Sequence, residues 1–225
     1  MNAAVRAVVA ELCGTAMLLA IVIGSGIMGE RLAAGNVALM LLVNALATGA
    51  GLYVLIASLA PVSGAHFNPL VTLMMRWRRS PLPAHWSLYL SAQFCGAVLG
   101  VWLAHAMFDL PLLQTGTTPR ATTGLWLSEF VATCGLLAVI RFGAAASTEV
   151  IAARIGCYIF AAYWFTASTS FANPAVTLAR MFSNSFAGIL PAHAPAFMLA
   201  QLAGLALVMA VSGRSSDHLP NNGAR

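Results

Sequence analysis

The chain has 225 residues, of which 60% are hydrophobic and only 8% are charged. This is more apolar sequence than one soluble core of that size can bury, so most of the surface must face lipid. The net charge is +5, and every basic residue counted in it is an arginine. The distribution of these arginines along the chain argues against a nucleic-acid-binding surface.

Six apolar segments follow one another along the chain, each close to the roughly 20 residues that cross a bilayer. They cover residues 5–27, 36–59, 84–107, 122–142, 150–169 and 194–213. The first segment has no clear small-residue cleavage site and leads directly into the second, which indicates a span rather than a signal peptide. We therefore expect one all-α membrane domain over residues 1–213, followed by a polar, disordered cytoplasmic tail at 214–225.

The arginines predict how the chain is oriented in the membrane. If the N-terminus is cytoplasmic, all but three of the 11 arginines lie inside, the exceptions being Arg31, Arg120 and Arg180. By the positive-inside rule, both termini should then be cytoplasmic. The four cysteines stand singly within the predicted spans and are expected to be small buried hydrophobes, with no metal site.

Polar landmarks recur in the same order in the two halves of the chain, roughly residues 1–108 and 120–213. Ala-Glu-Leu-Cys-Gly-Thr around Glu11 is matched by Ser-Glu-Phe-Val-Ala-Thr around Glu129, and Ala-Gln-Phe-Cys-Gly-Ala around Gln93 by Ala-Gln-Leu-Ala-Gly-Leu around Gln201. Because each half contains three spans, the second half must enter the membrane from the opposite face. The sequence thus predicts an inverted repeat.

Between these landmarks each half has an Asn-Pro box, Asn68-Pro69-Leu70 in the first and Asn173-Pro174-Ala175 in the second. The helix from Asn68 to Arg76 would be about 12 Å long, against a bilayer core about 30 Å thick. Asparagine is a good N-cap and proline fits the first helical turn, so each box should begin a half-helix near the midplane. The loops before the boxes should flank a pore, because non-helical backbone at that depth must be buried in protein or line a water-filled path.

The paired boxes, with Ser-Gly-Ala-His-Phe before the first, resemble the aquaporin, or major intrinsic protein, family over essentially the whole chain. The resemblance implies six transmembrane helices and two re-entrant half-helices. It also implies a homotetramer in the bacterial inner membrane, with one pore per protomer and the amides of Asn68 and Asn173 pointing into it. Small neutral solutes are the expected partners, and no cofactor is expected.

In family members that pass water or glycerol, an arginine directly after the second box usually forms the outer constriction of the pore. Three side chains complete it, one each from the second span, the fifth span and the second pore loop, and this chain departs from that pattern. The position of the arginine is Val176, and counting without gaps from the boxes places the other three on Thr48, Ala161 and Ser170. None of the four is charged or aromatic, which indicates a wide filter for uncharged solutes such as polyols, with water as a further candidate. A resemblance to the bacterial branch associated with arsenic-resistance operons implies neutral metalloid hydroxides or methylated arsenic acids.

The intramembrane carboxyls leave two functions open. Glu11 and Glu129 either accept hydrogen bonds from the re-entrant loops, with Gln93 and Gln201 acting from the other side, or serve a secondary transporter as a proton relay. An intramembrane enzyme is less favoured, because it would need a nucleophile with a base or a metal triad, and the five histidines stand far apart along the chain.

For two further residues the sequence leaves two roles open. His66 either lines the pore or is a satisfied buried histidine. Arg180 lies seven residues along the second half-helix, so we expect it near the outer surface, with a displaced filter arginine as the alternative.

Overall fold

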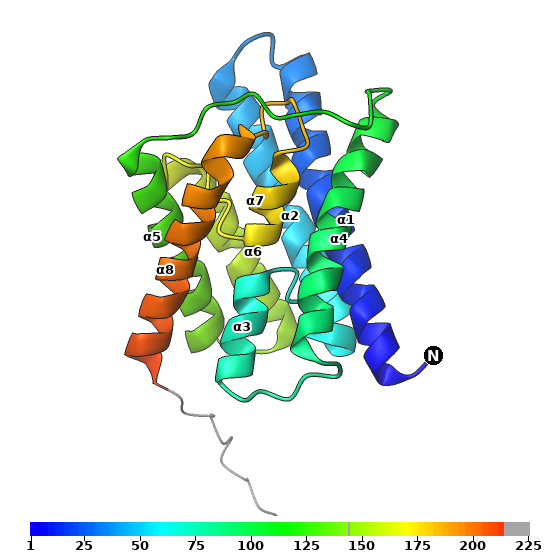
Figure 1. Cartoon of the computed structure of the whole chain (residues 1–225), viewed down its shortest axis with the longest axis vertical. Coiled ribbons are helices and arrows are strands. Elements are labelled where there is room, and N and C mark those ends of the chain that lie inside the picture. Colours follow the sequence, from blue (N-terminus) through cyan, green and yellow to red (C-terminus); the bar gives the residue numbers. More distant parts are fainter. Residues whose placement is uncertain (144, 214–225) are drawn as a thin grey trace, which may run out of the picture.

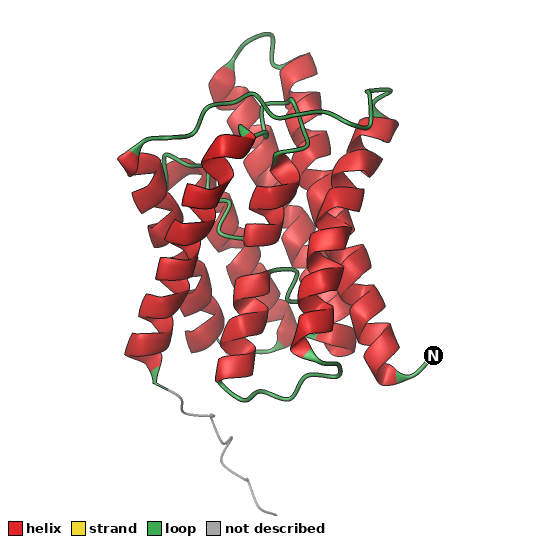
Figure 2. Cartoon of the chain, in the orientation of Figure 1, coloured by secondary structure: helices red, strands yellow, loops and turns green. Residues whose placement is uncertain are grey.

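The computed structural model describes residues 1–143 and 145–213, and within them every regular element is helical (Figure 2). The predicted tail at 214–225 lies outside the described residues. In chain order the elements are α1 (Ala3–Leu32), α2 (Val37–Ser63), α3 (Pro69–Trp77), α4 (Trp86–Met107), α5 (Thr123–Phe142), α6 (Thr148–Phe165), α7 (Pro174–Arg180), a 3₁₀ turn (Pro191–His193) and α8 (Ala194–Ser212).

The long helices form one bundle, and the two short helices lie inside it. Figure 1 shows α3 in the lower half of the bundle and α7 in the upper half, each reached by a loop that runs to mid-height. The two Asn-Pro boxes begin these helices, with Pro69 and Pro174 in their first turns. The half-helices expected from the sequence are therefore present at the expected residues.

Within residues 1–143 and 145–213, five helices are long and apolar enough to cross a membrane, and α6 is not among them. The α6 helix has 18 residues, includes Glu149 and Arg154, and ends at Phe165 rather than at the predicted residue 169. It nevertheless packs along α2 as part of the bundle. This predicted span is thus a shorter and more polar helix than the sequence indicated.

The second helix extends four residues beyond the predicted boundary at 59 and contains Pro61 in its last turns. Proline cannot donate to the carbonyl one turn back, which favours an early helix end. The helix instead stops at Gly64, whose φ of 88° lies in the left-handed region and whose N–H donates to the Ala60 carbonyl at 2.9 Å. Glycine at the C-cap, rather than the proline, determines the boundary.

Close contact between α1 and α4 depends on glycine. A Cβ atom added to Gly96 or Gly100 would overlap the carbonyl oxygens of Leu12 and Ala16. Small residues permit this approach of two backbones, which is the usual basis of helix packing in membranes.

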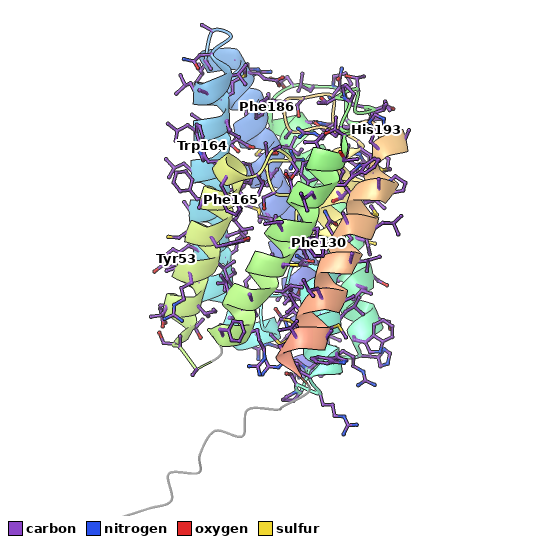
Figure 3. All side chains as sticks on the ribbon, turned by 90° about the vertical axis from the view of Figure 1, so that its left-hand side faces the viewer. Tyr53, Phe130, Trp164, Phe165, Phe186 and His193 are labelled. Carbon is purple, nitrogen blue, oxygen red and sulfur yellow. The ribbon has the colours of Figure 1, made fainter. Side chains whose placement is uncertain are left out.

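The outer surface of the bundle is apolar, as lipid-facing helices require. Figure 3 shows Tyr53, Trp164 and Phe165 projecting from one side, and these side chains are between 41% and 57% exposed. Cysteines 13, 95 and 157 are also exposed, so the expectation that the four cysteines are buried is wrong for these three. They face outward from helices whose small residues point inward.

Candidate functional site

The loops that lead into the two boxes have the same unusual backbone. Ala65 and Phe67 in the first loop, and Ser170 and Ala172 in the second, have φ values between 46° and 49°. In each loop, the first residue of the pair stands three positions before the box asparagine and the second stands one position before it. A non-glycine residue in the left-handed region costs about 1–3 kcal/mol, so both loops need support from surrounding elements.

Glu11 on α1 supplies that support to the first loop. Its Oε1 accepts from the His66 N–H at 2.9 Å and from the Ser63 hydroxyl at 2.7 Å. Its Oε2 accepts from the Phe67 N–H at 2.8 Å. The carboxylate is fully buried, so these bonds satisfy loop donors that lipid could not.

Glu129 on α5 plays the equivalent part in the second half. Its two oxygens accept from the N–H groups of Phe171 and Ala172, both at 2.9 Å. It is also fully buried. The inverted repeat predicted from the sequence thus extends to individual hydrogen bonds.

The two glutamines act on the carboxylates rather than on the loops. Gln93 donates to Glu11 at 2.8 Å and to the Thr72 hydroxyl at 2.9 Å. Gln201 donates to Glu129 at 2.6 Å and to a half-helix threonine at 2.9 Å. The expectation that the glutamines accept bonds from the loops is therefore wrong, because they link each glutamate to the neighbouring half-helix.

Each box asparagine has two structural partners. The Asn68 side-chain oxygen caps α3 by accepting from the Leu70 N–H, while its Nδ2 donates to the Ala172 carbonyl at 2.8 Å. Asn173 caps α7 in the same way, and its Nδ2 donates to the Phe67 carbonyl at 2.8 Å. Each asparagine therefore begins its own half-helix and holds the loop of the other half.

A cavity of about 650 Å³ passes both asparagines. It extends from residues at the end of α3 and the start of α6, including Arg78, Ser80 and Thr148, to Tyr163 and Arg180 at the opposite end. Between these ends the lining is mainly aliphatic, with side chains such as Leu52 and Ile155. An apolar wall with a few polar groups is typical of a site that admits small neutral molecules.

Several predicted site residues line this cavity. Thr48, Ser170 and Val176 do so close to Asn173, and each is at least nine-tenths buried. His66 also lines it, with Nδ1 3.0 Å from the Thr72 hydroxyl, so it faces the cavity and has a hydrogen-bond partner. Leu70 is fully buried behind Asn68 and is not part of the wall.

The structure places Ala161 away from the cavity, on the exposed side of α6. Ile159 and Tyr163, two residues to either side, line the wall instead. The gap-free count from the second box therefore does not reach the residues of α6 that line the cavity. Tyr163, which the sequence reasoning missed, lies 3.3 Å from Thr48, hydroxyl to hydroxyl.

Arg180 lies at the far end of the cavity and is buried in its wall. The side chain is 1% exposed and lines the same cavity as Val176. Its Nε donates to the Ala187 carbonyl, and its guanidinium carbon lies 3.4 Å from the centre of the Phe171 ring. Residues four apart share a helix face, so the spacing of Val176 and Arg180 was the available signal.

A second arginine, Arg120, stabilises the neighbouring loops. Its guanidinium donates to the carbonyls of Gly188, Ser168 and Phe186 at 3.1, 3.2 and 3.4 Å. Burial lowers the pKa of this guanidinium from its usual value, and Glu129 opposes that change. Among residues 1–143 and 145–213, no group of three or more His, Cys, Asp or Glu side chains could hold a metal ion.

Known proteins show the same architecture and sequence pattern. The chain is 48% identical to the aquaglyceroporin AqpS of Rhizobium meliloti (strain 1021) over 206 residues, which cover 92% of this chain and 88% of that protein. It is 41% identical to the probable aquaporin PIP2-8 of Oryza sativa subsp. japonica over 103 residues, or 45% of this chain and 36% of that one. An X-ray structure of the aquaglyceroporin from Plasmodium falciparum matches with a TM-score of 0.68 at 17% identity, covering 89% of this chain and 90% of that one, and shows the fold alone.

The model of the family described as "Major intrinsic protein" matches residues 1–166, well over half of the chain. This agrees with the paired half-helices, the duplicated glutamate braces and the cavity between them. The resemblance inferred from the Asn-Pro boxes is confirmed, and the chain belongs to the major intrinsic protein family.

Proposed function

We propose that the protein is a passive channel for small uncharged solutes bulkier than water, namely polyols and neutral oxyacids of metalloids, including methylated arsenic acids. The observation that carries the proposal is the cavity that runs past both box asparagines, with Val176 directly after the second box. A short aliphatic side chain there leaves space that a guanidinium would fill. The name of the relative from Rhizobium meliloti, an aquaglyceroporin, supports the same class of solute.

The surroundings of the two glutamates favour a channel over a proton-coupled transporter. Glu11 and Glu129 are fully buried, and neither lines the cavity. Every one of their carboxylate oxygens accepts at least one hydrogen bond from a loop N–H. A proton relay needs access to a carboxylate that can exchange its proton with the pathway, and these contacts leave no such access.

The orientation and assembly are also part of the proposal. The N-terminus, the end of α3 and the end of α8 lie at the same end of the bundle (Figure 1). Arg6 lies in the first turns of α1, Arg76 in the last turn of α3, and Arg78 is the C-cap of α3. We infer that this end is cytoplasmic and that the protein resides in a bacterial plasma membrane. The exposed apolar face around Tyr53 and Trp164 (Figure 3) is suited to lipid or to a neighbouring protomer of a homotetramer.

Stopped-flow swelling of proteoliposomes tests the proposed function. The wild type should admit glycerol, urea and boric acid at rates that rise linearly with concentration and need no ion gradient. Val176→Arg and Val176→Met both add length at the constriction, but only arginine adds a charge. Both variants should slow glycerol and boric acid while water flux persists, since the first effect is steric.

The variants also separate the competing explanations. A greater loss with Val176→Arg than with Val176→Met would show that charge adds to the steric effect. Equal glycerol and boric acid flux in wild type and both variants, with all three correctly assembled, would place the constriction elsewhere. A requirement for a proton gradient would favour the transporter instead.

A further inference from the structure

Two buried polar atoms in the cavity wall have no hydrogen-bond partner among the described residues. They are Nη1 of Arg180 and the hydroxyl oxygen of Ser170. Both side chains line the cavity, and they are 1% and 3% exposed. A buried polar group without a partner costs about 1–3 kcal/mol, so a wall that keeps two of them is suited to a molecule that supplies the missing bonds.

Two more hydroxyls belong to the same end of the cavity. Thr48 on α2 and Tyr163 on α6 line it, with their oxygens 3.3 Å apart. Tyr163 also lies within electrostatic and hydrogen-bonding range of the Arg180 guanidinium, whose Nη1 is the atom left without a partner. Three helices and the second re-entrant loop therefore bring four oxygen- or nitrogen-bearing side chains together.

Two contacts with the protein fix Arg180 in this position. Its Nε donates to the Ala187 carbonyl, and the Phe171 ring lies against its guanidinium. Arginine carries five donors in a rigid planar group, so a bond at Nε leaves Nη1 able to serve a solute. Among the described residues, none from the loop at 181–190 lines the cavity, so Arg180 stands at its limit on that side.

We propose that Arg180, together with Ser170, Thr48 and Tyr163, forms a binding site for a neutral solute bearing several oxygen atoms, such as an oxyacid or a polyol. The site supplies, one helical turn further along α7, the guanidinium that is missing at Val176. This inference rests on the proposed channel function and makes Arg180 a specificity-determining residue. The donors select oxygen-rich solutes, while the permanent charge opposes cations.

Arg120 provides a matched control for a purely structural arginine. It is 8% exposed, and its guanidinium lies 5.1 Å from the same Phe171 ring. Its side-chain hydrogen bonds go to loop carbonyls, and it does not line the cavity. Removing it should loosen the loops without changing which solutes are preferred.

The test compares boric acid, which has three hydroxyls, with acetamide, which has one carbonyl oxygen. Swelling of proteoliposomes is measured for wild type, Arg180→Met, Arg180→Lys, Ser170→Ala and Arg120→Met, together with inhibition of acetamide flux by boric acid. For Arg180→Met we expect the ratio of boric acid to acetamide flux to fall about tenfold, and half-inhibition to need about tenfold more boric acid, as loss of one charge-assisted hydrogen bond implies. Sodium leak should rise in Arg180→Met and stay low in Arg180→Lys.

Ser170→Ala removes a hydroxyl that has no hydrogen-bond partner among the described residues. The variant should therefore assemble normally and still lower the flux ratio severalfold. Arg120→Met should leave the ratio unchanged. An unchanged ratio and inhibition in Arg180→Met and Ser170→Ala, or an equal loss in Arg120→Met, would overturn the inference. If wild type itself admits neither solute, the proposed function fails, and this outcome is distinct from failure of the site alone.

Discussion

The brace formed by Glu129 predicts a graded response to substitution. Glu129→Ala leaves three buried N–H groups without an acceptor, namely those of Phe171 and Ala172 and one of the two on the Gln201 amide, whose other N–H keeps its bond to the half-helix threonine. At about 1–3 kcal/mol for each, the loss is about 3–9 kcal/mol. Glu129→Gln keeps one oxygen, which can still accept two of these bonds, so its cost is about 1–3 kcal/mol.

Thermal unfolding in detergent, paired with solute flux in proteoliposomes, measures this response. Glu129→Gln should lower Tm by about a third as much as Glu129→Ala and retain flux. Glu149→Gln is the matched control, because Glu149 is exposed in the first turn of α6 and its loss should be nearly neutral. Equal destabilisation by Gln and Ala would refute the brace, and a stable Glu129→Gln without flux would point to a proton relay.

Three other substitutions test separate features. Asn173→Ala removes the α7 cap and the bond to Phe67, which should destabilise the protein by about 1 kcal/mol or more, measured by thermal unfolding. Gly100→Val should prevent assembly because its Cβ would overlap the Ala16 carbonyl, as size-exclusion chromatography would show; normal assembly would mean that α1 and α4 can separate. Val176→Ala should speed glycerol entry by widening the cavity at this residue, and an unchanged swelling rate would mean that another part of the cavity limits the flux.

The local chemistry of the Asn-Pro boxes made the half-helices predictable. Asparagine as cap and proline in the first turn favour a helix start, and the short distance to Arg76 makes the first of these helices too short to cross the bilayer. The left-handed backbone at Phe67 and Ala172 was not predictable, because neither residue favours it. That conformation depends on carboxylates more than 40 residues away in sequence.

The cavity wall around Val176 was only partly predictable because it combines segments whose spacing the sequence does not specify. Val176 is tied to Asn173 by helical geometry, so its place on the wall follows from the box. The count to Ala161 crosses the irregular connection after α6, whereas the neighbouring residues that line the cavity are Ile159 and Tyr163. For Arg180 the distance along the helix was considered but not the angle around it, which is why its burial was missed.

The exchange of hydrogen bonds between the two boxes bears on how the chain is made. Asn68 donates to a carbonyl 104 residues later in the sequence, and Asn173 donates back across 106. Synthesis proceeds from the N-terminus, so α3 is complete long before its partner loop exists. The first half must therefore wait in the insertion machinery or the bilayer with that amide unsatisfied, and closure of the pore lining is a late step of biogenesis that only the finished second half can complete.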